Sequence, residues 1–185
     1  MPGFGENEAL KKPYEIENYV NEINNFLSLN NYHPDIIVGH SFGGKLAVFL
    51  AEKTKVNYLV LLSPSIINKD KTILTYIKIF LYKIIKRINF LNFISQKMGS
   101  EDYKYLSPIM KKTMSNIINK NGLKQFKKLS IETLLIYGKN DTITPPYLGK
   151  RLLKVNKKAH LILLDGNHFF YLSNIKIINK IIKEL

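Results

Sequence analysis

Residues 39–43, GHSFG, fit the pattern G-x-S-x-G, in which a serine lies on a sharp turn between a strand and a helix. The surrounding sequence supplies that context. Residues 36–38 are an apolar, β-branched run typical of a buried strand, and residues 45–53 have the pattern of a helix. Such a turn lifts the serine hydroxyl above the end of the strand. Ser41 is therefore the candidate nucleophile of a covalent reaction.

Glycines make so tight a turn possible. We expect Gly39 and Gly43 to be required because larger side chains would collide there. His40 completes the elbow and is expected to point away from the direction in which the serine attacks. The backbone N–H of Phe42 lies at the start of the helix, where it would point toward a developing oxyanion. An incidental serine in a glycine-rich turn is the alternative interpretation.

A serine hydroxyl is a weak nucleophile without a general base, and the sequence has four histidines that could serve. His168 follows the apolar run 161–164, so it lies in a loop after a strand, where active-site residues of parallel sheets gather. His33 precedes a strand, His40 is inside the turn, and His160 begins a strand. We predict that His168 is the base, with an ordinary loop histidine as the alternative.

The imidazole of such a base needs an acid to orient it. Asp141 lies in the loop after the apolar run 134–137, and Asp165 is its rival at the end of the strand before His168. Reaching back from Asp165 to an imidazole three residues later is awkward, so we favour Asp141. The alternative role of Asp141 is a helix N-cap or an Asx turn.

Strand and helix patterns alternate along the chain, which predicts an α/β fold with parallel strands. The predicted strands are 36–38, 58–62, 134–137 and 161–164. The predicted helices of this alternation are 15–30, 45–53, 146–155 and 175–185. Between the second and third strands the pattern changes to helices over 66–98 and 107–128. We therefore expect a helical insertion of about 60 residues at that point.

The net charge of +14 is concentrated in residues 66–128, which hold 14 basic and 3 acidic residues. The predicted helix over 66–98 is basic and amphipathic, a pattern also found in helices that lie on anionic membranes. We favour packing of its apolar face over Ser41 as a cap. Lys outnumbers Arg 26 to 2, and no aromatic–basic RNA signature or helix-turn-helix pattern is present. Nucleic acid is therefore not expected as a partner.

Several other classes of protein are excluded or disfavoured by what the sequence lacks. With no Cys, it forms no disulfide, no thiolate metal site and no Cys nucleophile. It has neither an H-E-x-x-H nor a P-loop pattern, so we expect no metal and no cofactor. The apolar runs are shorter than the roughly 18 residues that span a bilayer, so no transmembrane segment is expected. Residues 1–10 show no signal-peptide pattern, and we predict a cytoplasmic protein.

Taken together, the motifs resemble those of the α/β-hydrolase superfamily over nearly the whole chain. GHSFGG is similar to its nucleophile elbow, YGKNDTITP to its acid loop and GNHFFYLSN to its histidine loop. PGFG, at residues 2–5, is similar to the segment that follows its fourth strand. The chain order Ser41, Asp141, His168 is the order of that superfamily's triad.

The resemblance implies a core formed by residues 1–63 and 130–185 and a helical cap at 64–129. It also implies hydrolysis of a small-molecule carboxylic ester through an acyl-enzyme. The Ile, Leu, Phe and Tyr content of the cap favours an apolar acyl or alcohol group. Thioesterase and amidase activities stay open because the same triad performs them. Epoxide hydrolases and haloalkane dehalogenases of this fold are less expected, since they use Asp where this chain has Ser41.

One part of the superfamily pattern has no counterpart here. Its first four strands, and the loop that supplies a second oxyanion N–H, would precede PGFG, where this sequence has only Met1. We therefore expect a parallel-sheet α/β-hydrolase fold that lacks its first four strands. Strand 35–38 would then be a bare edge, open to self-association or to pairing with another chain. A non-catalytic or assembly-dependent fragment is thus an alternative to an active enzyme.

Overall fold

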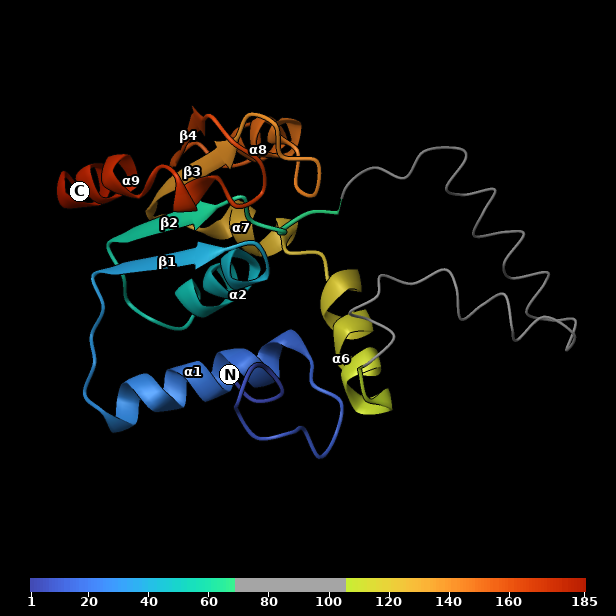
Figure 1. The fold of residues 1–185 in the computed structure, drawn as a ribbon. Helices are drawn as coiled ribbons and strands as arrows, with labels where there is room; N and C mark the ends of the chain where they lie inside the picture. The colour runs from blue at the N-terminus through green and yellow to red at the C-terminus, as the bar shows by residue number, and fades with distance from the viewer. Residues whose placement is uncertain (69–105) are drawn as a thin grey trace, which may run out of the picture. The chain divides into compact units, whose positions relative to one another are not determined.

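The computed structural model describes residues 1–68 and 106–185 (Figure 1). These residues fall into two compact units. The larger comprises Tyr14–Lys69 and Asn116–Leu185, and the described part of the smaller comprises Met1–Pro13 and residues 106–115. The helix predicted over residues 66–98 lies outside the described residues, apart from its first three positions.

The larger unit contains a sheet of four parallel strands in the order β1-β2-β3-β4. The strands are β1 (Ile36–His40), β2 (Tyr58–Leu62), β3 (Glu132–Gly138) and β4 (Ala159–Leu164). The four predicted strands and their parallel pairing are confirmed. β3 and β4 begin two residues before the predicted starts, because Thr133 pairs with Ala159 through the backbone although the flanking side chains are polar.

Helices connect these strands and continue beyond the last one (Figure 1). They are α1 (Ile16–Leu29), α2 (Phe42–Ala51), α6 (Pro108–Asn119), α7 (Leu123–Lys128), α8 (Pro146–Leu153) and α9 (Ile175–Lys183), with a 3-10 helix η1 (Phe170–Leu172). α2 begins three residues before its predicted start. The helix predicted over 107–128 is divided into α6 and α7, because the Asn121-Gly122 pair interrupts it.

The sheet is apolar on both faces, as expected for parallel strands that helices cover. Successive residues of β2 face opposite sides. Leu59 and Leu61 pack with residues of α2, α7 and α8 in the main core. Val60 and Leu62 pack on the other face with Phe170 of η1 and with residues of α9. The strands are therefore fixed in register, and their carboxyl ends meet at one edge of the sheet.

The smaller unit includes the PGFG segment. Gly3 has a φ of 79°, and its N–H donates to the carbonyl oxygen of Glu8 at 2.8 Å. A Cβ at this position would lie 2.7 Å from Sδ of Met110. The positive backbone angle favours glycine in this turn, and a larger residue would also displace the side chain of Met110.

A search of residues 1–68 and 106–185 finds no helix long and apolar enough to cross a membrane.

Candidate active site

Ser41 lies between the end of β1 and the first residue of α2, in a backbone conformation that non-glycine residues rarely adopt. Its φ is 51° and its ψ is −115°. Hydrogen bonds hold the backbone on both sides of the turn. The N–H of Ser41 donates to Leu62 O (2.9 Å), and its carbonyl oxygen accepts from the N–H groups of Lys45 (3.2 Å) and Ser65 (3.0 Å). Strain of this kind is common at functional sites and persists only where the surroundings enforce it.

The glycines around Ser41 are not equivalent. A Cβ on Gly39 would lie 2.6 Å from the carbonyl oxygen of Gly43, and a Cβ on Gly44 would lie 2.7 Å from Cβ of Pro64. A Cβ on Gly43 would meet no described atom within 4 Å. The prediction that Gly43 is sterically required is therefore wrong. The backbone of Gly43 lies close to position 39, so a side chain is sterically excluded at Gly39 and not at Gly43.

Asp141 and His168 form a buried pair in the loops that follow β3 and β4. Nδ1 of His168 lies 2.8 Å from Oδ2 of Asp141, and their side chains are only 8% and 0% exposed. The rival acid, Asp165, lies with its side chain 86% exposed and pairs with Lys139 instead (2.7 Å). Of the two candidate acids, the structure brings Asp141 to the imidazole.

Backbone contacts hold these two loops against each other. The N–H of Asn140 donates to the carbonyl oxygen of Gly166 at 3.0 Å. A Cβ on Gly138 would overlap the carbonyl oxygen of Asn167, so the loops approach this closely only with glycine at 138. Sequence reasoning did not single out Gly138, although a glycine directly after a predicted strand was a usable signal.

The carboxylate of Asp141 accepts several hydrogen bonds besides that of His168. Oδ1 accepts from the backbone N–H groups of Ile143 (2.8 Å) and Thr144 (2.9 Å). Oδ2 accepts from the Thr144 hydroxyl at 2.8 Å. The Asx-type turn considered as an alternative role is thus present together with the contact to His168. Thr144 is a residue that sequence reasoning missed, and its only signal was its place three residues after an Asp.

These contacts determine the charge of Asp141. Burial by itself raises its pKa, but the hydrogen bonds from His168 and from the backbone and hydroxyl of Thr144 outweigh burial. The pKa of this carboxyl is therefore held below its ordinary value. The group is a carboxylate at neutral pH, as a partner that stabilises an imidazolium must be.

The loop that carries His168 also meets the turn at Ser41. Nε2 of His40 lies 3.0 Å from the backbone carbonyl oxygen of His168. Within the described residues, no hydrogen bond joins the Ser41 hydroxyl to His168. In enzymes without bound substrate, catalytic hydrogen bonds are often long or poorly aligned and tighten when the substrate binds. Phe42 is the first residue of α2, and its backbone N–H lies at the helix N-terminus, which favours negative charge.

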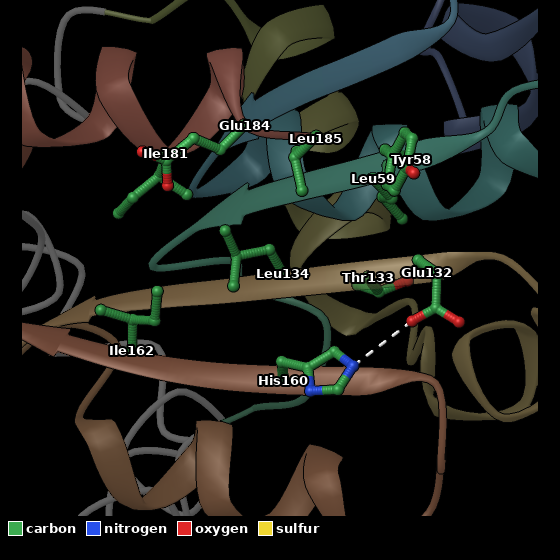
Figure 2. Close-up of a pocket in the computed structure, with 10 residues that line it drawn as sticks. All are labelled: Tyr58, Leu59, Glu132, Thr133, Leu134, His160, Ile162, Ile181, Glu184 and Leu185. Atoms are coloured by element: carbon green, nitrogen blue, oxygen red, sulfur yellow. Dashed lines mark hydrogen bonds and ion pairs between the residues drawn. The ribbon is translucent and has the colours of Figure 1, made fainter.

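A separate cavity of about 370 Å³ lies between the sheet and the end of α9 (Figure 2). Tyr58, Glu132 and His160 line it near the amino ends of β2, β3 and β4. In Figure 2 the imidazole of His160 faces the carboxylate of Glu132, with Nε2 and Oε2 3.3 Å apart. No predicted site residue lines this cavity. Because Ser41 lies at the opposite ends of the strands, the cavity does not belong to the candidate active site.

The described residues contain no group of three or more His, Asp or Glu side chains arranged to hold a metal ion.

Comparisons with known proteins agree with the fold described above. A family model described as alpha/beta hydrolase fold matches residues 1–83. An esterase from Exiguobacterium antarcticum has a TM-score of 0.72 and 14% identity, over 99% of this chain and 78% of that chain. A thermophilic esterase from Thermogutta terrifontis has a TM-score of 0.67 and 16% identity, over 100% and 76% of the two chains. A bromoperoxidase from Bacillus anthracis has a TM-score of 0.70 and 19% identity, over 98% and 77%. No curated protein matches the sequence.

This chain therefore has the α/β-hydrolase fold, and the resemblance and fold class predicted from its sequence are confirmed. At these low identities, the structural similarity establishes the fold. The similar structures include two esterases and a bromoperoxidase. Their activities are not assigned to this chain from structural similarity, because one fold hosts many activities.

Proposed function

We propose that this chain is a serine hydrolase that cleaves a carboxylic ester through an acyl-enzyme. Ser41 is the nucleophile, His168 the general base, and Asp141 the acid that orients the imidazole. The observation that carries the proposal is the buried 2.8 Å contact between Asp141 and His168. It occurs in a fold that also places Ser41 on a strained turn at the carboxyl end of β1.

The proposed reaction assigns one step to each of these groups. Asp141 accepts the hydrogen of Nδ1, which leaves Nε2 of His168 free of a proton and able to take one from Ser41. Ser41 Oγ then attacks the acyl carbonyl, and the N–H of Phe42 stabilises the oxyanion. His168 next protonates the departing alkoxide. A water molecule, deprotonated in the same way, attacks the acyl-enzyme and releases the acid.

An ester with an apolar acyl or alcohol group is the proposed substrate. Its support is the Ile, Leu, Phe and Tyr content of residues 64–129, which we propose as the cap. Thioester and amide cleavage use the same groups and are the alternatives. A thioesterase domain from the curacin biosynthetic pathway shares the fold, with a TM-score of 0.67 at 16% identity.

Hydrolysis of p-nitrophenyl acetate and p-nitrophenyl butyrate tests the proposal. We expect release of p-nitrophenol that Ser41→Ala reduces to the background rate. Ser28→Ala, the same substitution at an exposed position of α1, is the matched control and should keep the activity. If the folded chain hydrolyses neither ester faster than Ser41→Ala does, the carboxylic ester assignment is wrong.

We also propose that residues 35–38 allow two copies of the chain to pair. Within the described sheet, β1 pairs with β2 only, and Val38 is 49% exposed. An apolar strand with an unpaired edge favours pairing with a second strand. Analytical ultracentrifugation should show a dimer whose fraction increases with protein concentration. The Val38→Lys variant should form less dimer at the same concentration. A monomer at every concentration would rule this pairing out.

A further inference from the structure

His40 connects the nucleophile's turn to the loop of the base. Its Nε2 lies 3.0 Å from the backbone carbonyl oxygen of His168. The two imidazole rings have their centroids 4.7 Å apart, at an angle of 48°. Because a carbonyl oxygen only accepts hydrogen bonds, Nε2 of His40 carries the hydrogen and donates it. This contact assigns the tautomer of His40 and joins two segments 128 residues apart in the chain.

The ring of His40 is held in this orientation by its neighbours. The ring of Tyr171 lies 4.7 Å away, centroid to centroid, and that of Phe169 lies 6.0 Å away. Burial lowers the pKa of His40, although its hydrogen bond to His168 acts in the opposite direction. A neutral ring suits this place, since a charged one would repel the imidazolium that the proposed reaction forms on His168.

Two hydrogen bonds then act on His168 from different ends. Asp141 binds Nδ1 and sets the rotation of the imidazole. His40 binds the carbonyl oxygen and sets the backbone from which the imidazole extends. His40 is also the residue directly before Ser41, so its position moves with the nucleophile's turn.

We propose that His40 is a positioning residue, whose Nε2–H holds the backbone of His168 where the imidazole can reach Ser41. This inference rests on the proposed serine hydrolase function. A displacement of about 1 Å between reacting groups costs on the order of 100-fold in rate, so losing this contact should slow the chemical step. Substrate binding does not use the contact and should change little.

Two substitutions separate the hydrogen bond from the bulk of the ring. His40→Phe keeps an aromatic ring among Phe169 and Tyr171 but removes the donor. His40→Gln places an amide N–H close to the position of Nε2. With p-nitrophenyl butyrate, we expect His40→Phe to lower kcat about 10- to 100-fold with KM nearly unchanged. His40→Gln should stay within about threefold of the wild-type kcat.

The outcomes are distinct. Equal activity of His40→Phe and wild type overturns the positioning role. An equal loss in both variants overturns it too, because a donor near the position of Nε2 would then fail to restore kcat. The ¹⁵N chemical shifts of the His40 ring give a readout that needs no activity. They should report the tautomer with hydrogen on Nε2, and hydrogen on Nδ1 alone overturns the proposal. An inactive wild type with the expected tautomer would refute the hydrolase function while leaving the contact in place, so the two failures can be told apart.

Discussion

We expect the chain to become more stable as the pH rises from 7 to 9.5, because the buried ammonium group of Lys45 loses its proton more readily in the folded state. Lys45 lies in the first turn of α2 and is only 2% exposed. Its Nζ donates to the carbonyl oxygens of Ile117 and Lys120, at 3.0 Å each, at the C-terminal end of α6. Such carbonyls favour a positive charge. Desolvation still dominates and lowers the pKa from 10.5 to about 8.

The sign and size of the effect follow from these two pKa values. Between about 8 and 10.5 the unfolded chain binds more protons at Lys45 than the folded chain does, so the free energy of unfolding rises with pH. The interval between the two values corresponds to about 3 kcal/mol. Between pH 7 and 9.5, about 2 kcal/mol of this is gained. Below pH 8 the lysine is charged in both states, and this contribution is lost.

Urea unfolding of wild type and Lys45→Met measures this contribution, since Met keeps an apolar side chain of similar length and does not titrate. The stability of wild type relative to Lys45→Met should increase by about 2 kcal/mol from pH 7 to 9.5. Lys53→Met, at an exposed position, controls for the loss of one positive charge. A difference that stays flat over this range, or that falls, would show that the two carbonyls compensate fully for burial.

Three further predictions concern the site. Asp141→Asn should preserve the fold and lower kcat about 10⁴-fold, because an amide favours the wrong tautomer of His168; a loss of less than tenfold in p-nitrophenyl butyrate hydrolysis would contradict this. Gly39→Ala should lower the free energy of unfolding by about 3 kcal/mol or more, since its Cβ would lie 2.6 Å from the carbonyl oxygen of Gly43. Gly43→Ala should stay within about 1 kcal/mol of wild type in the same urea titration, and equal losses would refute the steric difference. Thr144→Val removes a hydroxyl that donates to Asp141 and should lower kcat about tenfold, whereas Thr144→Ser should restore it.

The strands were predictable because each contains a continuous apolar run, and burial of both sheet faces requires such runs. The run at 58–62 coincides with β2. The first residues of β3 and β4 were not predictable, because the polar residues Glu132 and His160 join the sheet through their backbones. The early start of α2 also depends on geometry, since the strained conformation of Ser41 lets the helix begin at the next residue.

The candidate site was predictable where a motif fixes the residue and its place after a strand. Asp141 was preferred to Asp165 from chain geometry, and the structure pairs it with His168. Gly138 was missed because its importance comes from its close approach to the backbone of Asn167 in another loop. Thr144 was missed although it lies in the same loop as Asp141, because an Asp followed three residues later by Thr is a common turn pattern without a specific function. The cap at residues 64–129 and the core at 1–63 and 130–185 stay predictions.

Covalent labelling of Ser41 tests the proposed triad most directly. The folded chain is incubated with a fluorophosphonate, which reacts with a serine activated by a neighbouring base, and the modified peptide is located by tandem mass spectrometry. We predict a single adduct at Ser41, formed far more slowly in His168→Ala and absent in Ser41→Ala. No adduct on the folded wild-type chain, or an adduct that forms equally fast without His168, would contradict the assignment of Ser41 as an activated nucleophile.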